Sequence, residues 1–310
     1  ILDPETGRIS IPDNSFSIIG DRSVSNIFCD SRGWLWIKVW GGLFCMDPGN
    51  NELKQVHGIA DDQLGICEDD LGNLWMGAGS GLRRVGIDRQ NRTFEITEVP
   101  VLPENSERQI SGRVLYKDPF DGSLWLGTYH NGLFNIEIPC RTPGKGHTGK
   151  IINYKLEPGN ETALRSSFVT SVLRTSESDI WVGTEGGGFS HGVFSDSGLV
   201  FTTYDESDGL SNNVVKAIVE DDSGDLWIST NRGLNKFVRE TGQFVVFNVN
   251  DGLPSDYFTN AALKLSDNRI LLGGNKGLTL FDPENISQDT VSPIPEIGSF
   301  QLSYETVYPL

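Results

Sequence analysis

The chain has 310 residues, of which 22% are charged and 37% hydrophobic, so it is long enough to bury a sizeable core. The formal net charge of −17 argues against nucleic acid as a partner, because phosphate binding requires clustered Lys and Arg. No run of 18 apolar residues is present to span a membrane. The chain begins without Met at ILDPETGRI, and we interpret it as a mature or excised segment.

The acidic residues are spread along the chain and recur in turns, which favours a solvated surface over a dedicated cation site. The four cysteines form no CxxC pair, and no His lies at metal-ligand spacing. We therefore expect no metal and no cofactor. Cys29, Cys45 and Cys67 lie in apolar runs and are predicted to be small buried residues, while the disulfide status of these three and Cys140 stays open.

Six copies of one pattern follow each other along the chain, each with an apolar-Trp step between two turns. In order they read GWLWIKVWGGLF, GNLWMGAGSGLR, GSLWLGTYHNGLF, SDIWVGTEGGGF, GDLWISTNRGLN and NRILLGGNKGLT. Their anchors are Trp36, Trp75, Trp125, Trp181, Trp227 and, weakened, Leu271, separated by 39, 50, 56, 46 and 44 residues. A period of this size indicates a repeat architecture.

Each copy is predicted to form four short antiparallel strands, here called a to d. In the fifth copy they are VKAIVED (215–221), DLWIST (225–230), GLNKFV (233–238) and GQFVVFN (242–248). Val, Ile, Phe and Trp dominate these runs, and Gly, Asp, Asn and Ser separate them. In the a–b turn, Asp222 is predicted to bond the backbone ahead of it while Gly224 takes a positive φ.

Strand b is apolar on both sides, as in LWI, LWM, LWL and IWV, so both of its faces must be covered. Helical periodicity is absent, and a two-sheet sandwich would show alternation without a fixed period. The sequence therefore predicts an all-β fold, a β-propeller of four-stranded antiparallel blades. Six blades can be counted, and the N-terminal DPETGRISI is predicted to supply the strand that closes the last blade.

The repeat ends near residue 290. Residues 1–290 are predicted to form the propeller, and residues 291–310, VSPIPEIGSFQLSYETVYPL, a linker and the first strand of a following domain. The prolines of this segment mark the boundary.

The stretches DDSGDLWISTNRGLNKF, RETGQFVVFNVNDGLPSDYF and YDESDGLSNNVV carry a resemblance to two-component regulator propeller repeats. The tail SPIPEIGSFQLSY is similar to the start of an Ig-like Y_Y_Y domain. The resemblance implies the periplasmic sensor region of a hybrid two-component system histidine kinase, with a neighbouring propeller and Ig-like domain in the same chain. It also implies seven blades rather than six, and it fixes no ligand-binding residue.

No motif for covalent or nucleotide chemistry is complete. GKGHTGKI (144–151) resembles a phosphate loop, but Ile151 stands where Ser or Thr would hold magnesium, and it leads into a predicted strand. The cluster GAGSGL (77–82) is explained by its place in a b–c turn, since no βαβ unit surrounds it. His130 and His191 are the two histidines considered for acid–base chemistry.

The b–c turns are where the copies differ most. In a propeller these turns share one face with the d–a loops, so this face is predicted to carry Trp40, Tyr129, His130, Glu185, Asn231, Arg232 and Lys276. Aromatic platforms beside paired polar groups are typical of sugar sites. The alternative is that these turns are polar because they are exposed to solvent, and that Trp40 packs on Trp34.

Three functions follow from these patterns. The first is a non-enzymatic sensor of an oligosaccharide or another small extracellular ligand, with a homodimer among its expected partnerships, that signals through domain rearrangement. The second is a propeller lyase or glycoside-acting enzyme, for which Glu185 and His130 are the available acid–base pair. The third is a protein-interaction scaffold that uses Trp40 and the third-copy insertion at residues 139–150.

Overall fold

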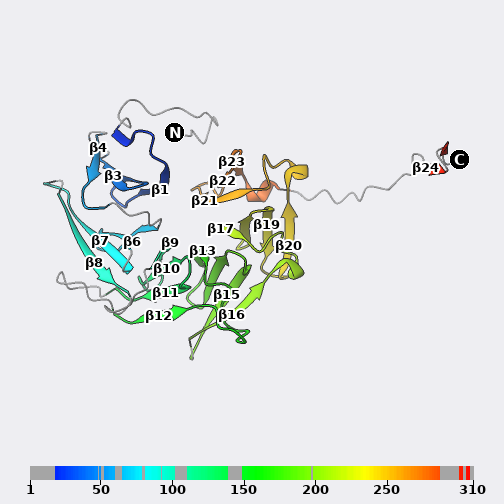
Figure 1. Ribbon diagram of the computed structural model, residues 1–310, viewed down its shortest axis with the longest axis horizontal. Coiled ribbons are helices and arrows are strands. Elements are labelled where there is room, and N and C mark those ends of the chain that lie inside the picture. Colours follow the sequence, from blue (N-terminus) through cyan, green and yellow to red (C-terminus); the bar gives the residue numbers. More distant parts are fainter. Residues whose placement is uncertain are drawn as a thin grey trace.

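The computed structural model describes residues 18–286, with gaps at 48, 50–51, 60–64, 79–80, 92, 102–109, 139–148 and 197, and the backbone of two strands near the C-terminus. These residues form five four-stranded antiparallel sheets and one three-stranded sheet in chain order, which we call blades 1 to 6. The all-β propeller predicted from the repeat is confirmed. Figure 1 shows the blades following one another around an axis.

The strands of the first three blades are β1 (Val24–Cys29), β2 (Leu35–Val39), β3 (Gly42–Met46) and β4 (Leu53–Val56), then β5 (Ile66–Glu68), β6 (Leu74–Ala78), β7 (Gly81–Asp88) and β8 (Thr93–Pro100), then β9 (Gly112–Lys117), β10 (Leu124–Thr128), β11 (Leu133–Ile136) and β12 (Ile151–Tyr154).

The strands of the last three are β13 (Val169–Arg174), β14 (Asp179–Thr184), β15 (Phe189–Ser195) and β16 (Gly198–Tyr204), then β17 (Val215–Glu220), β18 (Leu226–Thr230), β19 (Gly233–Val238) and β20 (Gln243–Phe247), then β21 (Phe258–Lys264), β22 (Ile270–Gly274) and β23 (Gly277–Phe281). Three short 3-10 helices lie after blades 4, 5 and 6: Glu206–Asp208, Val249–Asp251 and Pro283–Asn285.

Each blade is a meander in which consecutive strands pair. The first strand of a blade lies nearest the axis and the last strand outermost, as β13 and β16 show in Figure 1. The strands predicted for the fifth copy agree with β17 to β20 to within one residue at each end. Blade 6 has three strands among the described residues, and the N-terminal segment predicted to complete it lies outside them. Near the C-terminus, β24 (Phe300–Leu302) and β25 (Glu305–Val307) pair antiparallel.

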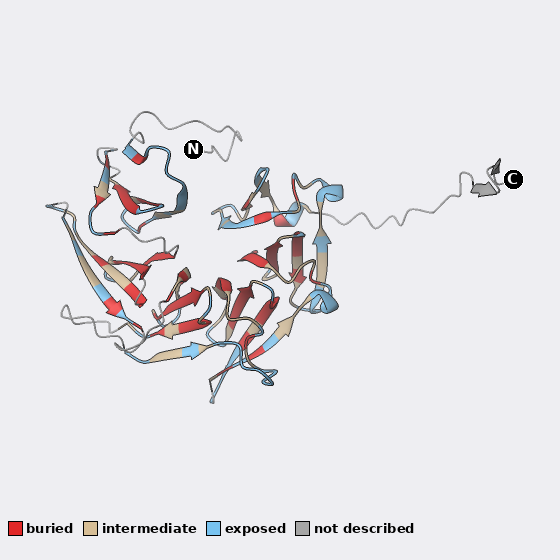
Figure 2. Ribbon diagram, in the orientation of Figure 1, coloured by how far each residue is buried: buried red, intermediate tan, exposed pale blue. Residues whose placement is uncertain are grey.

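The core is a series of apolar layers between neighbouring blades. Trp75 packs with Leu115, Leu124 and Leu126 of blade 3, and Trp227 packs with Ile270 and Leu272 of blade 6. Each Trp anchor thus faces the next blade, while the strand that carries it is covered from the other side. The sheets in Figure 2 are accordingly buried along their central strands. This arrangement explains why strand b is apolar on both sides.

An Asp at the end of strand a fixes the Trp anchor of the same blade. Asp221 Oδ1 accepts from the backbone N–H of Ser223 and Asp225, and its Oδ2 accepts from Trp227 Nε1 at 2.9 Å. Asp30, Asp69 and Asp118 hold the anchors of blades 1 to 3 in the same way, and Thr175 Oγ1 does so in blade 4. Gly224 has the predicted positive φ of 83°.

The prediction that Asp222 makes this turn is wrong by one residue. Asp222 points instead to blade 6, where it accepts a 2.6 Å hydrogen bond from Lys264 Nζ. Asp221 is the residue directly beyond strand a, so its two oxygens face the turn backbone and the indole together.

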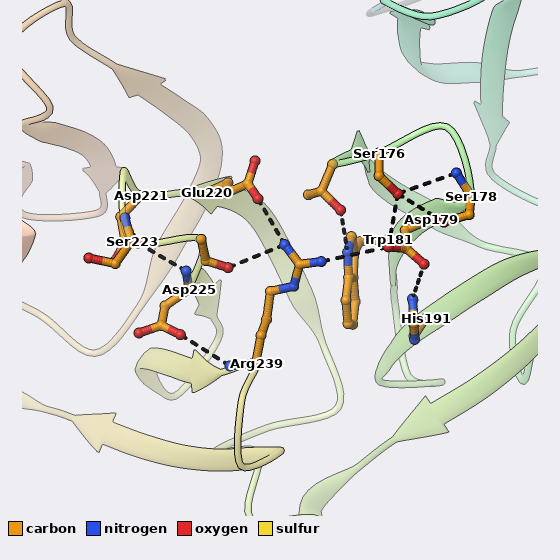
Figure 3. A network of polar contacts seen from close by, with 12 residues as sticks. Ser176, Ser178, Asp179, Trp181, His191, Glu220, Asp221, Ser223, Asp225 and Arg239 are labelled. Carbon is orange, nitrogen blue, oxygen red and sulfur yellow. Dashed lines mark hydrogen bonds and ion pairs between the residues drawn. The ribbon is translucent and has the colours of Figure 1, made fainter.

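Ion pairs join neighbouring blades on this a–b turn face. Figure 3 shows the junction of blades 4 and 5, where Arg239 bonds Glu220 at 2.9 Å and lies 3.7 Å from Asp179. Arg89 of blade 2 reaches Asp30 of blade 1 at 2.8 Å, and Arg174 of blade 4 pairs with buried Asp118 of blade 3. The blades are therefore bonded by charge at their rims as well as by apolar packing.

Blades 1 and 6 each have one flank that packs against no other blade among the described residues, and these flanks expose apolar side chains. Val24 and Ile27 on β1 and Leu263 and Leu278 in blade 6 are each about half exposed or more. Cys45 and Cys67 are buried as predicted, but Cys29 is exposed, because β1 lies on the uncovered flank of blade 1. Burial also raises the pKa of the Cys67 thiol. Cys140 lies outside the described residues.

Candidate functional site

The b–c turns and the d–a loops lie on one face of the propeller, which we call the turn face. In five blades the first residue of the b–c turn donates its backbone N–H to the carbonyl just before strand a: Trp40 to Ser23, Tyr129 to Ser111, Glu185 to Phe168, Asn231 to Val214 and Asn275 to Tyr257. The predicted shared face is therefore present, and four of the predicted ligand residues occupy the same repeat position.

The predicted residues are spread around this face. Trp40, His130, Arg232 and Lys276 are exposed, while Tyr129, Glu185 and Asn231 are half buried. Trp40 has 70% of its surface exposed. It does not pack on Trp34, which stacks on Trp36 near the opposite end of β2, because a strand of this length separates the two by roughly 20 Å.

The structure gathers an aromatic cluster around Tyr129. The Tyr129 ring lies 4.8 Å from Phe168 and 6.3 Å from His130, measured between centroids. The guanidinium of Arg113 covers both the Tyr129 and Phe168 rings, at 5.1 and 5.0 Å from their centroids. Its Nη1 donates to Tyr129 Oη at 3.0 Å, so the ring is fixed in place.

The two groups offered for acid–base chemistry are not joined. His130 lies beside the Phe168 ring and Glu185 bonds the Phe168 backbone, but no hydrogen bond or ion pair links Glu185 to His130 within the described part of the chain. The hydrogen-bonded pair is instead His191 and Asp179, at 3.0 Å on the opposite side of blade 4 (Figure 3). There His191 stacks flat on Trp181 at 4.0 Å, which makes it part of the blade packing.

A second set of polar residues was missed by the sequence reasoning. Strand a carries a β-bulge near the turn face in five blades, at Ser25, Arg113, Thr170, Lys216 and within residues 259–261. A bulge leaves one residue unpaired and redirects its side chain, and bulges are common beside active sites. Each bulge holds a polar residue within an otherwise mostly apolar innermost strand. We call these positions the bulge ring.

Asn260 of blade 6 ties three members of the bulge ring together. Its Oδ1 accepts from Arg113 Nη2 at 2.8 Å, and its Nδ2 donates to the carbonyls of Lys216 at 2.8 Å and Thr170 at 3.3 Å. Since β9, β13, β17 and β21 surround the axis in Figure 1, these contacts converge there. Arg113, Thr170, Lys216 and Asn260 therefore meet near the axis, where Arg113 also contacts the turn residue Tyr129.

Lys216 is buried, with 8% of its surface exposed. Burial lowers the pKa of its ammonium group; Glu185 acts in the opposite direction, and Arg113 lowers it further. The described residues hold no cluster of three or more His, Cys, Asp or Glu placed to bind a metal ion. Within the same residues, no helix has the length and apolarity needed to cross a membrane.

Comparison with known proteins identifies the repeat. A family model described as "Two component regulator propeller" matches residues 209–232, which run from the loop before β17 into the b–c turn of blade 5. Residues 209–232 therefore match a two-component regulator propeller repeat. A curated relative, "Histidine kinase P4" of Formosa agariphila, is 30% identical over a 350-residue alignment that covers 94% of this chain. The chain spans 24% of that relative's length.

Solved structures share the fold of this propeller. The extracellular domain of a putative hybrid two component system from B. thetaiotaomicron has a TM-score of 0.57 at 17% identity, covering 93% of this chain and 44% of that one. PorZ, a surface component of the type-IX secretion system of Porphyromonas gingivalis, reaches 0.64 at 17% identity, covering 84% and 38%. Virginiamycin B lyase from Staphylococcus aureus reaches 0.55 at 15% identity, covering 84% of each chain.

Proposed function

We propose that this two-component regulator propeller is the ligand-sensing part of a longer hybrid two-component regulator, and that its turn face binds an oligosaccharide. The observation that carries the proposal is the aromatic cluster of Tyr129, Phe168 and His130 beside Arg113, with exposed Trp40 on the same face. Sugars stack their apolar faces on aromatic rings and bond their hydroxyls to fixed polar groups.

The proposal places the propeller in the periplasm, beside a neighbouring propeller and an Ig-like domain of the same chain. The kinase name of the Formosa agariphila relative and the extracellular domain from B. thetaiotaomicron support this setting. A signal then arises only if the ligand binds one domain arrangement better than another. The exposed apolar flanks of blades 1 and 6 offer a surface for such a neighbour or for a second copy. The net charge of −17 disfavours nucleic acid as a partner.

Catalysis by this chain is the second candidate, because virginiamycin B lyase shares the fold. We propose a non-enzymatic role for the chain, and the Glu185–His130 pair considered for acid–base chemistry is not joined by a hydrogen bond among the described residues. A protein-interaction scaffold is the third candidate. Its proposed docking loop, residues 139–150, lies almost wholly outside the described residues.

The test is to screen the purified chain against an oligosaccharide library for both binding and turnover. Saturable binding without any change in the oligosaccharide is the expected result. Release of cleaved or unsaturated products would replace the sensor by an enzyme. Absence of binding to every library member would remove the oligosaccharide proposal.

A further inference from the structure

Many Lys and Arg side chains of this propeller pair with carboxylates, among them Arg83 with Glu98 and Arg165 with Asp205 near the turn face. On the a–b turn face, Lys and Arg side chains pair with carboxylates: Arg89 with Asp30, Arg174 with Asp118, Lys236 with Asp225, Arg239 with Glu220 and Lys264 with Asp222. These pairs compensate the cost of taking charge out of water. In a chain with 42 acidic and 25 basic residues, a carboxylate partner is easy to supply.

Two basic side chains of the bulge ring have no such partner. Among the described residues, neither Arg113 nor Lys216 has a carboxylate oxygen within 4.0 Å. Arg113 bonds only neutral acceptors, Tyr129 Oη and Asn260 Oδ1. Lys216 is 8% exposed, and its ammonium group bonds no group in the same part of the chain. Burial disfavours the charged form of Lys216, and Glu185 offsets this without forming an ion pair, so a bound anion would compensate the charge further.

The guanidinium of Arg113 and the backbone of Lys216 are held close to one another. The amide of Asn260 bonds the guanidinium of Arg113 with its oxygen and the backbone carbonyl of Lys216 with its nitrogen, both at 2.8 Å. Thr170 lies between them in blade 4, and its carbonyl accepts a 3.3 Å hydrogen bond from the same amide. Thr170 is 3% exposed, and its Oγ1 is buried without a hydrogen-bond partner among the described residues.

The unused donors match an oxyanion. Arg113 has five N–H donors, of which its hydrogen bonds to Tyr129 and Asn260 use two. Lys216 has three more, and the Thr170 hydroxyl adds one. Arg binds carboxylate and sulfate oxygens as a planar fork, while Lys acts as a point charge. The cation–π contacts of Arg113 with Tyr129 and Phe168 hold the fork in place before any ligand arrives.

We propose that Arg113, Thr170 and Lys216 form a subsite for an anionic group of the ligand, a carboxylate or a sulfate. The inference rests on the proposed function of the turn face and narrows it to acidic oligosaccharides. The neutral sugar ring adjoining the anionic group then lies against Tyr129, which directly contacts Arg113. The common repeat geometry supplies the bulge, and the residue at each bulge sets what is bound.

The experiment is isothermal titration calorimetry at fixed ionic strength with four probes: trigalacturonate, a sulfated carrageenan tetrasaccharide, neutral cellotetraose and sodium sulfate alone. The wild type is compared with Lys216→Met and Thr170→Val, and their folding is checked by urea denaturation. Lys264→Met is the matched control, since it removes one positive charge from the other end of an innermost strand, β21.

The wild type is expected to bind at least one anionic probe, and Lys216→Met to weaken it about tenfold or more, because a charge-assisted contact is lost. Thr170→Val is expected to weaken it less, and Lys264→Met not at all. Comparison of trigalacturonate with the sulfated tetrasaccharide shows whether the subsite binds a carboxylate or a sulfate.

Equal anion binding by wild type and Lys216→Met overturns the subsite. Binding of cellotetraose without binding of any anionic probe also overturns the subsite, but it leaves the oligosaccharide proposal intact. Sulfate binding that depends on Lys216 without binding of any sugar keeps the subsite and removes the oligosaccharide proposal. If none of the four probes binds, both the anion subsite and the oligosaccharide proposal are wrong.

Discussion

Arg113 on β9 and Asn260 on β21 are joined by a 2.8 Å hydrogen bond, although 147 positions separate them in the sequence. The same Asn260 side chain donates to carbonyls of blades 4 and 5. One amide group thus connects the innermost strands of four blades near the axis. The apolar layers join neighbouring blades, so this contact is a direct link across the propeller.

Replacing Asn260 by Ala is expected to lower the free energy of unfolding by about 1–2 kcal/mol, because a hydrogen bond to a charged group and two to carbonyls are lost from a partly exposed site. Urea denaturation followed by Trp fluorescence measures this. Asn250→Ala, in the exposed Val249–Asp251 turn, is the control and should change little. Equal effects of the two substitutions would mean that the link carries no stability.

The Asp that holds each Trp anchor is expected to matter most where it also carries an ion pair. Asp118 accepts from Trp125 Nε1 and pairs with Arg174, and both side chains of that pair are buried. Asp118→Asn leaves the Arg174 charge uncompensated and should cost about 3–5 kcal/mol. Thr175 performs the same anchoring in blade 4 without an ion pair, so Thr175→Ala should cost only about 1 kcal/mol. Comparable losses in the two variants would refute the role of the charge.

Most of this framework could be predicted from sequence because it is repeated. The Trp step and the two-sided apolar strand recur in the first five copies, where they correspond to β2, β6, β10, β14 and β18. The inter-blade ion pairs could not be predicted, because Arg89 and Asp30 are 59 positions apart and no local pattern relates them. Asp221 was missed in favour of Asp222 because both acids suit the turn, and only the position of Trp227 separates them.

Acid is expected to weaken the junction of blades 1 and 2. Burial by itself raises the pKa of Asp30, but hydrogen bonds from Arg89, Trp36 and the turn backbone outweigh it and hold this pKa below its ordinary value of 3.8. A carboxyl with a lowered folded-state pKa contributes stability that is complete above the ordinary value and is lost as pH falls through the folded value. Asp30→Asn should therefore be less stable than wild type at pH 6, with the difference shrinking below about pH 4. Urea denaturation from pH 2 to 7 measures it, and a gap that stays constant with pH would contradict the assignment.

Lys216→Met is expected to stabilise the fold. Burial lowers the pKa of Lys216, with Arg113 adding to and Glu185 opposing the shift, so the charged form is disfavoured in the folded state at neutral pH. As pH rises from the lowered pKa toward the ordinary value of 10.5, the wild type sheds this penalty and the advantage of the variant shrinks. Urea denaturation at pH 7 and pH 10 measures both effects. If Lys216→Met is less stable than wild type at pH 7, Lys216 stabilises the folded state and the prediction is wrong.

As with the fold, part of the candidate site could be predicted from sequence and part could not. The turn residues could be placed on one face from sequence because their repeat position fixes it. The bulge ring was missed because a bulge depends on strand register, which the letters of one strand do not show. A signal was nevertheless present: Ser25, Thr170, Lys216 and Asn260 each precede the Trp or Leu anchor of their copy by 11 residues, and Arg113 precedes Trp125 by 12. A polar residue at a fixed place in an apolar strand is the pattern that reveals it.

The most direct test of the account is calorimetry of oligosaccharide binding to wild type, Tyr129→Ala and Trp40→Ala, with Phe120→Ala as the control. Phe120 is an exposed aromatic residue of the a–b turn face, so its loss leaves the turn face intact. The account predicts that Tyr129→Ala and Trp40→Ala each weaken binding by about tenfold while Phe120→Ala does not, because an aromatic platform is lost only in the first two. Unchanged affinity in both turn-face variants would contradict it.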